Sequence, residues 1–477
     1  MTEVKFGTSG LRGRVEDLTN NLSRAYMRAF LQHMAQAHNL QPGSAVLVGR
    51  DLRASSPRLA AAICAEIAAD GFKAENCGLV PTPALALAAL AGAAPAVMIT
   101  GSHIPEDRNG LKFYRPDGEI DKQDETAIMR RVQAAADQGQ AAEALENPAL
   151  PPEDDRARQA YIKRALDFLP PQALRGLHIG IYQHSSVARD ILADIMTGLG
   201  AEIIVLHRAE KFIAVDTEAL REEDRRLAHN AATEYRLDAL ISTDGDGDRP
   251  LIADEKGEFL PGDIIGILTA YFLQADSVAT PVTTTTALEK SGFFSHIYRC
   301  RVGSPFVLAA MAAAGEAGGR LIVGFEANGG VLLGSSVPLP QNRVLAALPT
   351  RDAVLPILSL LALARQKNLP LSGLRALLPA RFTAGDRLQN YPPEAAAQLL
   401  AQLAAMAPGA HLAGVSGKVA ACNTKDGVRL SFDNGDILHF RASGNAPELR
   451  CYSEAASQAG AAALVQAGLA LAVKAAA

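Results

Sequence analysis

The chain has 477 residues, 20% of them charged, and a formal net charge of −5, which excludes a general nucleic-acid-binding surface. Hydrophobic residues make up 48% of the sequence, an ordinary share for a packed globular protein. The length predicts about three domains, or more if they are small.

The cysteine pattern indicates a reducing compartment. Five cysteines, an odd number, lie far apart in the chain and never at the paired spacing of a zinc site. We therefore expect no disulfide framework, no zinc site and a cytoplasmic location. Small buried apolar residues are expected at Cys64, Cys77, Cys300, Cys422 and Cys451.

Strand and helix patterns alternate from the start of the chain. The first of these are a buried strand at 46–49, a helix at 57–69, and a turn with a strand at 71–77. The stretch 76–102 carries no charge, but three prolines and a glycine interrupt it. A membrane span needs about twenty continuous apolar residues. We therefore predict a short helix at 82–90 and a strand ending at Ile99, and no membrane association.

A loop rich in small residues follows this strand. Gly101 lets the backbone turn where a side chain would clash, and Pro105 stiffens the exit. Between them, Ser102 is expected to point outward at the carboxyl end of the strand, where open α/β sheets place their chemistry. On the local pattern alone, a serine that only caps a helix or closes a turn is the more common case.

The second α/β unit carries an aspartate loop. A polar boundary at 147–155 precedes a helix at 156–168 and a strand at 178–182, and a buried strand at 237–241 leads into the loop. Alternate side chains of an extended backbone share a face, so three aspartates are expected to converge. Their mutual repulsion requires a cation, and carboxylate oxygens suit Mg²⁺ or Ca²⁺. These aspartates are Asp244, Asp246 and Asp248.

Two alternatives exist for this loop. With Glu255, the aspartates occupy the first, third, fifth and twelfth positions of an EF-hand. However, Arg249 stands where the EF-hand requires glycine, Pro250 follows, and the flanks have strand patterns, so the context argues against it. The other alternative is a solvated acidic turn. Glycines that alternate with aspartates after a buried strand make this the less favoured interpretation.

The rest of the chain contains a third α/β unit and a different final unit. We expect a strand at 321–324 and a long apolar helix after Arg351. A junction at 379–387 follows. Strand patterns at 428–432 and 437–440 flank an Asn-Gly turn, which is a strong hairpin signal. The final unit is therefore predicted to be an antiparallel sheet with helices.

The serine loop and the aspartate loop together resemble those of the α-D-phosphohexomutase family. Three more segments are similar to family motifs: FGTSGLRG at 6–13, GFEANGG at 324–330 and RASGNAPELR at 441–450. All five occur in the family's order and span essentially the whole chain. The resemblance implies three mixed α/β sandwich domains plus a C-terminal α+β domain around a central cleft.

The resemblance also implies where the domains and their loops lie. The domains are expected at 1–150 with the phosphoserine loop, 151–255 with the metal loop, 256–378 with the sugar-recognition loop and 379–477 with the phosphate-binding loop.

The activity implied is reversible transfer of a phosphoryl group between positions 1 and 6 of a hexose. Ser102 would be stored as a phosphoserine and would donate its phosphoryl group to a hexose monophosphate. The resulting hexose 1,6-bisphosphate would reorient in the cleft and return its other phosphoryl group to Ser102. The same bisphosphate is also expected to serve as an activator. One Mg²⁺ per chain is expected, bound by Asp244, Asp246, Asp248 and the phosphorylated Ser102.

Three residues are expected beside the phosphoserine. By family match, Lys112 transfers the proton between the sugar hydroxyl and the serine, which requires burial or positive surroundings to lower its pKa. Arg12 and His103 are expected to contact the phosphate. The alternatives are a solvated surface lysine at 112 and an ordinary hydrogen-bonding loop histidine at 103.

The resemblance places substrate contacts on three domains. Arginine forks and backbone N–H groups of the last domain suit the phosphate that is not transferred, and closure of that domain would exclude water. The expected substrate-binding residues are Arg249, Glu326, Asn328, Arg441, Ser443, Gly444, Asn445 and Arg450.

Several positions depart from the family pattern. Gly101 and Ile104 replace an alanine and an asparagine, and Asn445 and Ala446 replace a threonine and a glutamate. In the sugar-recognition loop a histidine is lost at Gly330. The loop at 302–305 also lacks a histidine common in the family, so phosphate contacts from the third domain would come from Arg301 or Arg343.

These changes affect the expected sugar more than the expected reaction. The first expectation is phosphomannomutase activity, the interconversion of mannose 6-phosphate and mannose 1-phosphate. Phosphoglucomutase or phosphoglucosamine mutase activity comes next. A non-catalytic sugar-phosphate-binding protein and a phosphatase are the alternatives from other classes. The expected partner is a hexose phosphate, with no nucleic acid and no membrane, and the chain is expected to be a monomer or a homodimer.

Overall fold

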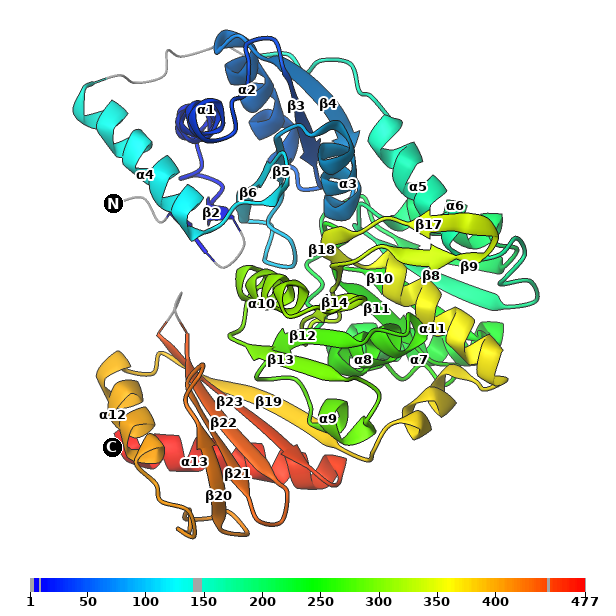
Figure 1. Cartoon of the computed structure of the whole chain (residues 1–477), viewed down its shortest axis with the longest axis vertical. Coiled ribbons are helices and arrows are strands. Elements are labelled where there is room, and N and C mark those ends of the chain that lie inside the picture. Colours follow the sequence, from blue (N-terminus) through cyan, green and yellow to red (C-terminus); the bar gives the residue numbers. More distant parts are fainter. Residues whose placement is uncertain (1–3, 8–9, 140–147, 444–446, 477) are drawn as a thin grey trace.

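The computed structural model describes residues 4–7, 10–139, 148–443 and 447–476. Figure 1 shows four domains that follow one another along an arc, with the first and the fourth at its ends. The first three are mixed sheets with helices, and the fourth is an antiparallel sheet with helices. The predicted fold class is confirmed.

The first domain is a mixed sheet between two layers of helices. Its elements are β1 (Lys5–Phe6), β2 (Leu11–Arg14), α1 (Asn20–Ala37), β3 (Ala45–Arg50), α2 (Ser56–Ala69), β4 (Lys73–Leu79), α3 (Thr82–Gly92), β5 (Ala96–Ile99), β6 (Arg108–Arg115), β7 (Gly118–Glu119) and α4 (Lys122–Asp137). The strand order is β1-β2-β6-β5-β3-β4, with β7 beside β6, and among the described strands the parallel pairs are β3–β4 and β3–β5. Side chains of β3 alternate, so Val46 and Val48 join the core of α1 and α2, whereas Leu47 joins that of α3.

The second domain is a smaller sheet that ends in the aspartate loop. Its elements are α5 (Arg156–Phe168), β8 (His178–His184), α6 (Arg189–Gly198), β9 (Glu202–Arg208), α7 (Glu222–Tyr235), β10 (Ala239–Thr243) and β11 (Pro250–Ala253). The strand order is β11-β10-β8-β9. Strand β8 runs parallel to β9 and β10, and β10 pairs with β11 as an antiparallel hairpin. The aspartates therefore occupy a hairpin loop at the carboxyl end of β10.

The third domain continues the same architecture. Its elements are α8 (Gly262–Phe272), β12 (Ser277–Pro281), α9 (Ala287–Ser291), β13 (His296–Cys300), α10 (Ser304–Glu316), β14 (Ile322–Phe325), β15 (Val331–Leu333), β16 (Val337–Leu339), η1 (Pro340–Asn342), β17 (Arg343–Leu345), β18 (Leu348–Asp352), α11 (Val354–Lys367) and η2 (Leu371–Leu377). The main sheet has the order β13-β12-β14-β15-β18, and β16 and β17 form a separate hairpin. Helix α11 is the expected apolar helix after Arg351.

The fourth domain is an antiparallel sheet. Its elements are β19 (Phe382–Gln389), α12 (Pro393–Ala404), β20 (Val419–Asn423), β21 (Val428–Phe432), β22 (Ile437–Ala442), β23 (Glu448–Ala455) and α13 (Gln458–Ala476). The order is β19-β23-β22-β21-β20, and every pair is antiparallel. Strands β21 and β22 are the predicted hairpin. The expected phosphate-binding loop connects β22 to β23, and its residues 444–446 lie outside the described part of the chain.

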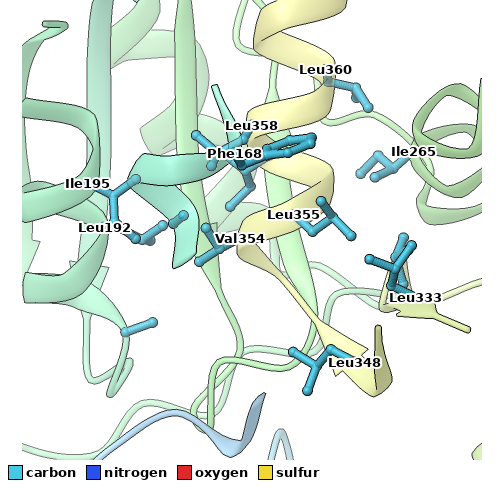
Figure 2. Packing of buried hydrophobic residues seen from close by; sticks show 14 of the residues in the cluster. Phe168, Leu192, Ile195, Ile265, Leu333, Leu348, Val354, Leu355, Leu358 and Leu360 are labelled. Atoms are coloured by element: carbon cyan, nitrogen blue, oxygen red, sulfur yellow. The ribbon is translucent and has the colours of Figure 1, made fainter. Parts of the chain in front are cut away.

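One apolar core is shared by the first three domains, and a further cluster of buried side chains lies in each of them. One cluster of buried side chains extends along the sequence from Leu47 to Leu378, whereas the fourth domain has a cluster of its own. Figure 2 shows side chains of α5 and α6, such as Phe168 and Leu192, packed with side chains of α8 and α11, such as Ile265 and Leu358. The first three domains therefore hold their shared edges rigidly.

One helix of the described chain is long and apolar enough to cross a membrane by length and composition. This is α13, with 19 residues. It packs against the sheet of the fourth domain and buries one face that includes Leu464, Gly468 and Leu469. The stretch 76–102 contains α3 and β5, as predicted, rather than a continuous helix.

All five cysteines are free thiols. Four are buried, and burial raises the pKa of Cys64 to about 12. Cys422 is exposed on β20, so the expectation of burial is wrong there. Strand β20 is the last strand of its sheet, and its residues from Ala420 to Asn423 are all exposed.

Candidate active site

Ser102 lies just beyond the end of β5 and has an unusual backbone. Its φ of +56° falls in the left-handed region that few non-glycine residues occupy. The backbone N–H donates to Thr100 Oγ1 at 2.8 Å, and the residue has no exposed surface. Such a strained conformation persists only where the surrounding structure holds it.

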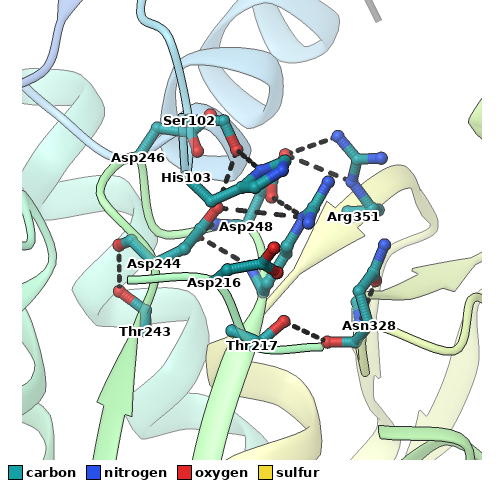
Figure 3. Close-up of polar contacts among 12 residues, drawn as sticks. Ser102, His103, Asp216, Thr217, Thr243, Asp244, Asp246, Asp248, Asn328 and Arg351 are labelled. Carbon is teal, nitrogen blue, oxygen red and sulfur yellow. Dashed lines mark hydrogen bonds and ion pairs between the residues drawn. The ribbon is translucent and has the colours of Figure 1, made fainter. Parts of the chain in front are cut away.

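The Ser102 hydroxyl meets the aspartate loop of the second domain. Oγ donates to Asp244 Oδ2 at 2.8 Å and lies 3.3 Å from His103 Nδ1 (Figure 3). A serine that caps a helix or closes a turn bonds instead to a nearby backbone group, so this alternative is wrong here. Burial, together with the charges of Arg249 and Arg12, lowers the pKa of His103.

The three aspartates converge because their loop is a tight turn. The Asp244 N–H donates to the Arg249 carbonyl at 3.1 Å, and Gly247 has a φ of +73°. The N–H groups of Asp248 and Arg249 both donate to Asp244 Oδ1 at 3.2 Å. The predicted convergence is therefore confirmed, but the extended backbone from which it was inferred is wrong.

The aspartate loop is buried, which contradicts the alternative of a solvated turn. Asp244 and Asp246 have no exposed surface, and Asp248 has 1%. The EF-hand alternative also fails, because Glu255 accepts hydrogen bonds from Ser372 and so faces away from the loop. Helix α3 closes the loop from the first domain, since its Thr82 Oγ1 donates to Asp246 Oδ2 at 2.6 Å.

The carboxylates are suited to hold a metal ion. One oxygen from each aspartate lies within 4.8 Å of the others. Burial, and then the charges of Asp246 and Asp248, raise the pKa of Asp244 well above its usual range. Asp246 Oδ1 and Asp248 Oδ1 are buried and make no hydrogen bond with any described residue. Unpaired buried carboxylate oxygens match the needs of a hard divalent cation.

Two cations of the chain already contact this cluster. Lys112 Nζ lies 2.6 Å from Asp246 Oδ2 and 2.8 Å from Asp248 Oδ2, and Arg351 Nη2 lies 2.8 Å from Asp248 Oδ2. Lys112 is 5% exposed, which excludes a solvated surface lysine. Burial acts to lower the pKa of Lys112, but the charges of Asp246 and Asp248 outweigh it, so the pKa is raised. The expected lowering is wrong.

Arg249 and Arg12 supply further positive charge. Arg249 Nε lies 3.9 Å from Asp244 Oδ2, and its Nε and Nη1 are buried without a hydrogen-bond partner among the described residues. Such unpaired donors are suited to an anionic substrate group. Arg12, on β2, is half-buried, and burial and the charge of Arg249 lower its pKa to about 10.

Arg351 joins the aspartate loop to the sugar-recognition loop. Its Nη1 donates to Glu326 Oε2 and to Ser304 Oγ, both at 2.8 Å, while the other side of the guanidinium contacts Asp248. Asn328 Oδ1 accepts from the Gly330 N–H at 3.0 Å. No family motif includes Arg351, which is the next-to-last residue of β18. Its position was therefore not predictable from the sequence pattern.

A segment of the second domain also reaches the sugar-recognition loop. Thr217 Oγ1 donates to the Asn328 carbonyl at 3.0 Å, as Figure 3 shows. Glu218, whose side chain is 49% exposed, has its Oε2 3.9 Å from Arg249 Nη1. Loop residues at 212–218 carry no motif that predicts this contact.

The expected phosphate-binding residues of the fourth domain lie apart from this network. Arg441 Nε lies 3.0 Å from Asp426 Oδ2, and Arg450 Nε has no hydrogen-bond partner among the described residues. The Ser443 N–H donates to the Glu448 carbonyl at 2.9 Å. Gly444 and Asn445 lie outside the described residues.

The two arginines considered as phosphate ligands from the third domain contact other groups. Arg343 donates to the Asp167 carbonyl at 2.6 Å, which ties the β16–β17 hairpin to the second domain. Arg301 is exposed and lies over the Phe306 ring at 4.8 Å from its centroid. Arg343 therefore does not join the aspartate network.

Comparison with known proteins identifies the family. Profiles described as phosphoglucomutase/phosphomannomutase alpha/beta/alpha domains I, II and III match residues 3–139, 159–257 and 261–382, and the C-terminal domain profile matches 390–470. The chain belongs to the phosphoglucomutase/phosphomannomutase family. The resemblance to α-D-phosphohexomutases inferred from the five motifs is thus confirmed.

Members of this family are similar to the chain over nearly its whole length. A phosphomannomutase of Sinorhizobium fredii (strain NBRC 101917 / NGR234) is 45% identical, covering 98% of each chain. A phosphomannomutase of Salmonella muenchen is 44% identical over 95% of this chain and 92% of that one. The fold matches a crystal structure of a family protein from Burkholderia thailandensis with a TM-score of 0.75, at 22% identity, over 98% of this chain and 97% of that one.

Proposed function

We propose that the protein is a phosphomannomutase, an isomerase that interconverts mannose 6-phosphate and mannose 1-phosphate. The reaction passes through a phosphoserine at Ser102 and a hexose 1,6-bisphosphate that also activates the enzyme. Two phosphomannomutases at 44–45% identity support the choice of sugar. The observation that carries the proposal is the 2.8 Å contact between Ser102 Oγ and Asp244, because it joins the nucleophile to a buried three-carboxylate site.

The metal is proposed to be one Mg²⁺ per chain. Asp244, Asp246 and Asp248 would hold it, together with an oxygen on the phosphorylated Ser102. When bound, this ion supplies positive charge that neutralises the transferring phosphoryl group. The unpaired oxygens of Asp246 and Asp248 support the assignment.

In the proposed transfer, the bond between phosphorus and Ser102 Oγ breaks as a bond to the sugar hydroxyl oxygen forms. The charges of Asp246 and Asp248 outweigh the effect of burial and raise the pKa of Lys112. We assign to Lys112 the transfer of the proton from the sugar hydroxyl to Ser102 Oγ. Arg12, Arg249 and His103 are assigned to the phosphoryl oxygens.

The remaining contacts position the sugar and its second phosphate. Glu326 and Asn328 are assigned to ring hydroxyls, and Arg441, Ser443, Gly444, Asn445 and Arg450 to the phosphate that is not transferred. Glucose phosphates are the second candidate substrates. Glu326 lies in a loop that has lost the family's histidine, so the loop carries few groups with which to reject a hexose that differs only at position 2.

Domain boundaries and location are proposed on the same basis. We divide the chain at 1–150, 151–255, 256–378 and 379–477, whereas the second and third family profiles end at 257 and 382, a few residues past these divisions. A cytoplasmic location is proposed because all five cysteines are free thiols, and a monomeric or homodimeric state is proposed as well.

The decisive experiment tests whether Ser102 is phosphorylated and whether the enzyme still turns over when Ser102 is replaced by alanine. Purified protein is incubated with mannose 1,6-bisphosphate, and phosphate is located by intact mass spectrometry and peptide mapping. We expect one phosphate on Ser102, and Ser102→Ala should lower kcat/KM by roughly 1,000-fold or more. Ser242→Ala is the control, because it removes another buried serine hydroxyl, one that bonds only to backbone carbonyls.

Two outcomes would contradict the proposal. Stable phosphate on another residue, with Ser102→Ala fully active, would exclude the mechanism. Release of inorganic phosphate as the main product would indicate a phosphatase. Turnover of glucosamine 1-phosphate above that of mannose and glucose 1-phosphates would change the substrate while leaving the reaction intact.

A further inference from the structure

A buried arginine outside the expected site lies directly behind the serine loop. Arg53 follows β3 in the first domain, and it is 1% exposed. Its Nε lies 3.2 Å from Asp51 Oδ2, which also accepts from Thr100 Oγ1 at 2.7 Å. The guanidinium is therefore fixed by a carboxylate that is itself bonded to the end of the serine strand.

The other donors of Arg53 all go to the backbone of the serine loop. Nη2 donates to the carbonyls of Ser102 at 2.9 Å and Ile104 at 2.6 Å. Nη1 donates to the carbonyls of Pro105 at 2.7 Å and Arg108 at 2.9 Å. One side chain thus donates hydrogen bonds to four backbone carbonyls between Ser102 and Arg108. Without these bonds the carbonyls would lack this donor in a buried place.

The faces of the guanidinium are also covered. The Phe212 ring of the second domain lies on it, with 4.0 Å from the ring centroid to Arg53 Cζ. A Cβ added at Gly101 would come within 2.6 Å of Arg53 Cζ. A larger residue at position 101 would therefore displace the guanidinium or the loop.

We propose that Arg53 is a positioning residue for phosphoryl transfer. It does not contact Ser102 Oγ, but it holds the Ser102 carbonyl and so maintains the left-handed backbone that directs Oγ to Asp244. The stacking of Phe212 extends the same support to the second domain, so that the serine loop and the aspartate loop keep one relative position. This inference rests on the proposed phosphoserine mechanism.

The expected size follows from the geometry of the transfer. Without the guanidinium, the loop carbonyls lose their donors in a buried place, and the strained Ser102 backbone can relax. A misplacement of a reacting group by about 1 Å can cost about 100-fold in rate. Binding of the bisphosphate depends on other arginines, so its affinity should change little.

The experiment measures phosphoryl transfer and binding separately. Arg53→Ala and Arg53→Lys are rapidly mixed with mannose 1,6-bisphosphate, quenched and analysed by intact mass for the rate of Ser102 phosphorylation. The Kd of Ser102→Ala and of the double variant Ser102→Ala/Arg53→Ala for the same bisphosphate is measured by calorimetry. Hydrogen exchange of 100–108 reports loop order without any turnover.

Two further variants make the test specific. Gly101→Ala displaces the guanidinium without removing any charge or hydrogen-bond donor, so it applies even if Arg53→Ala does not fold. Arg24→Lys is the control, because Arg24 is another buried arginine of the same domain and its Nε lies 2.7 Å from Glu66 Oε2, away from the serine loop.

We expect phosphorylation to slow by about 100-fold in Arg53→Ala and by less in Arg53→Lys and Gly101→Ala, with Kd within about threefold. Arg24→Lys should alter thermal stability but not the phosphorylation rate. Folded Arg53 and Gly101 variants that are phosphorylated at the wild-type rate would overturn the proposal. If the wild type itself is not phosphorylated on Ser102, the proposed function fails instead, and faster exchange at 100–108 would still register the loss of loop support.

Discussion

The aspartate loop with Lys112 and Arg351, here called the transfer centre because phosphoryl transfer is proposed there, differs from the fourth domain in how its charged groups are paired. At the centre, Lys112 and Arg351 are buried and pair with aspartates at 2.6–2.8 Å. In the fourth domain, the Arg450 side chain is 37% exposed, and its Nη2 lies 3.8 Å from Glu448 Oε2. Arg441 Nε lies 3.0 Å from Asp426 Oδ2.

This difference matches two different tasks. Phosphoryl transfer requires reacting atoms in one fixed geometry, which prearranged charges provide without reorganisation. The proposed bisphosphate must present each of its two phosphates in turn to the fourth domain. An arginine whose contact with a carboxylate is as long as that of Arg450 can turn toward either phosphate. Under the proposed mechanism, the tightly paired charges lie where bonds change, and the more loosely paired arginine lies where the substrate is only held.

The largest effect is expected from the aspartate loop. Asp246→Asn removes one charge from the cluster, so the site should lose its divalent cation and kcat/KM should fall by about 1,000-fold or more. Chelator should silence the wild type, and Mg²⁺ should restore it. Asp254→Asn, which alters a buried aspartate bonded to backbone N–H groups nearby, is the control. Unchanged turnover in excess chelator would exclude metal assistance.

Arg351 should show the next largest effect. Arg351→Met leaves Asp248 and Glu326 without the cation they share, and removal of one partner of a buried pair typically costs about 3–5 kcal/mol. We expect kcat to fall by about 100-fold and Tm to drop, measured by steady-state assay and calorimetry. Arg320→Met, on the exposed surface of the same domain, should change neither. Retention of kcat would show that the centre does not depend on this bridge.

Arg450 should affect binding rather than chemistry. Hydrogen bonds to charged groups contribute about 1.5–3 kcal/mol, so Arg450→Ala should raise KM by roughly 30-fold while kcat changes by less than about threefold. Arg387→Ala, an exposed arginine on the neighbouring strand, is the control. If Arg450→Ala lowers kcat as strongly as Arg351→Met does, the contrast between the two regions is wrong.

Glu326 tests whether the sugar is read through groups that mannose and glucose share. Glu326→Gln should lower kcat/KM for mannose 1-phosphate and glucose 1-phosphate together, by about 10-fold, with their ratio little changed. Lower activity is expected on glucosamine 1-phosphate for every variant. The measurement is kcat/KM for the three sugars at one bisphosphate concentration. Strict rejection of mannose phosphate would overturn the assignment.

The smallest effect on turnover is expected at His439 of the fourth domain. Burial lowers the pKa of His439 to about 4, and the positive charges of Arg429 and Arg441 lower it further. The contact of Nε2 with the Asp426 carbonyl acts in the other direction. The unfolded chain therefore binds a proton between pH 6.5 and 4 that the folded chain does not. The contribution of His439 to the free energy of unfolding is fully present above pH 6.5. This contribution falls by about 3 kcal/mol as the pH drops to about 4.

His439→Gln should remove this pH-dependent part and leave activity at pH 7.5 unchanged. Urea unfolding followed between pH 7.5 and 4.5 provides the measurement. The wild type should lose stability more steeply than the variant below pH 6.5. Parallel curves for the two proteins would show that the buried histidine does not contribute.

Local patterns predicted the elements, and motifs brought together the serine, lysine and aspartates. Helix α5 begins and ends at the predicted residues, and the predicted hairpin appears as β21 and β22. The pattern did not reveal Arg53, because its carbonyl partners lie 49 to 55 residues further along the chain. The direction of the Lys112 pKa also depends on distant partners, namely Asp246 and Asp248, which only the fold brings to it.

Exchange of segments between related genes is constrained by the apolar core that the first three domains share. A crossover within that core would oppose side chains from different ancestors, such as Phe168 and Leu358, and mismatched volumes cost stability. The fourth domain has its own core and joins the third through polar contacts such as those of Glu454 with Thr286 and of Asp426 with Val302. A crossover near Arg381 keeps every core intact. The fourth domain, which carries the proposed phosphate-binding loop, is therefore the part of the chain that related genes can exchange with the least loss of stability.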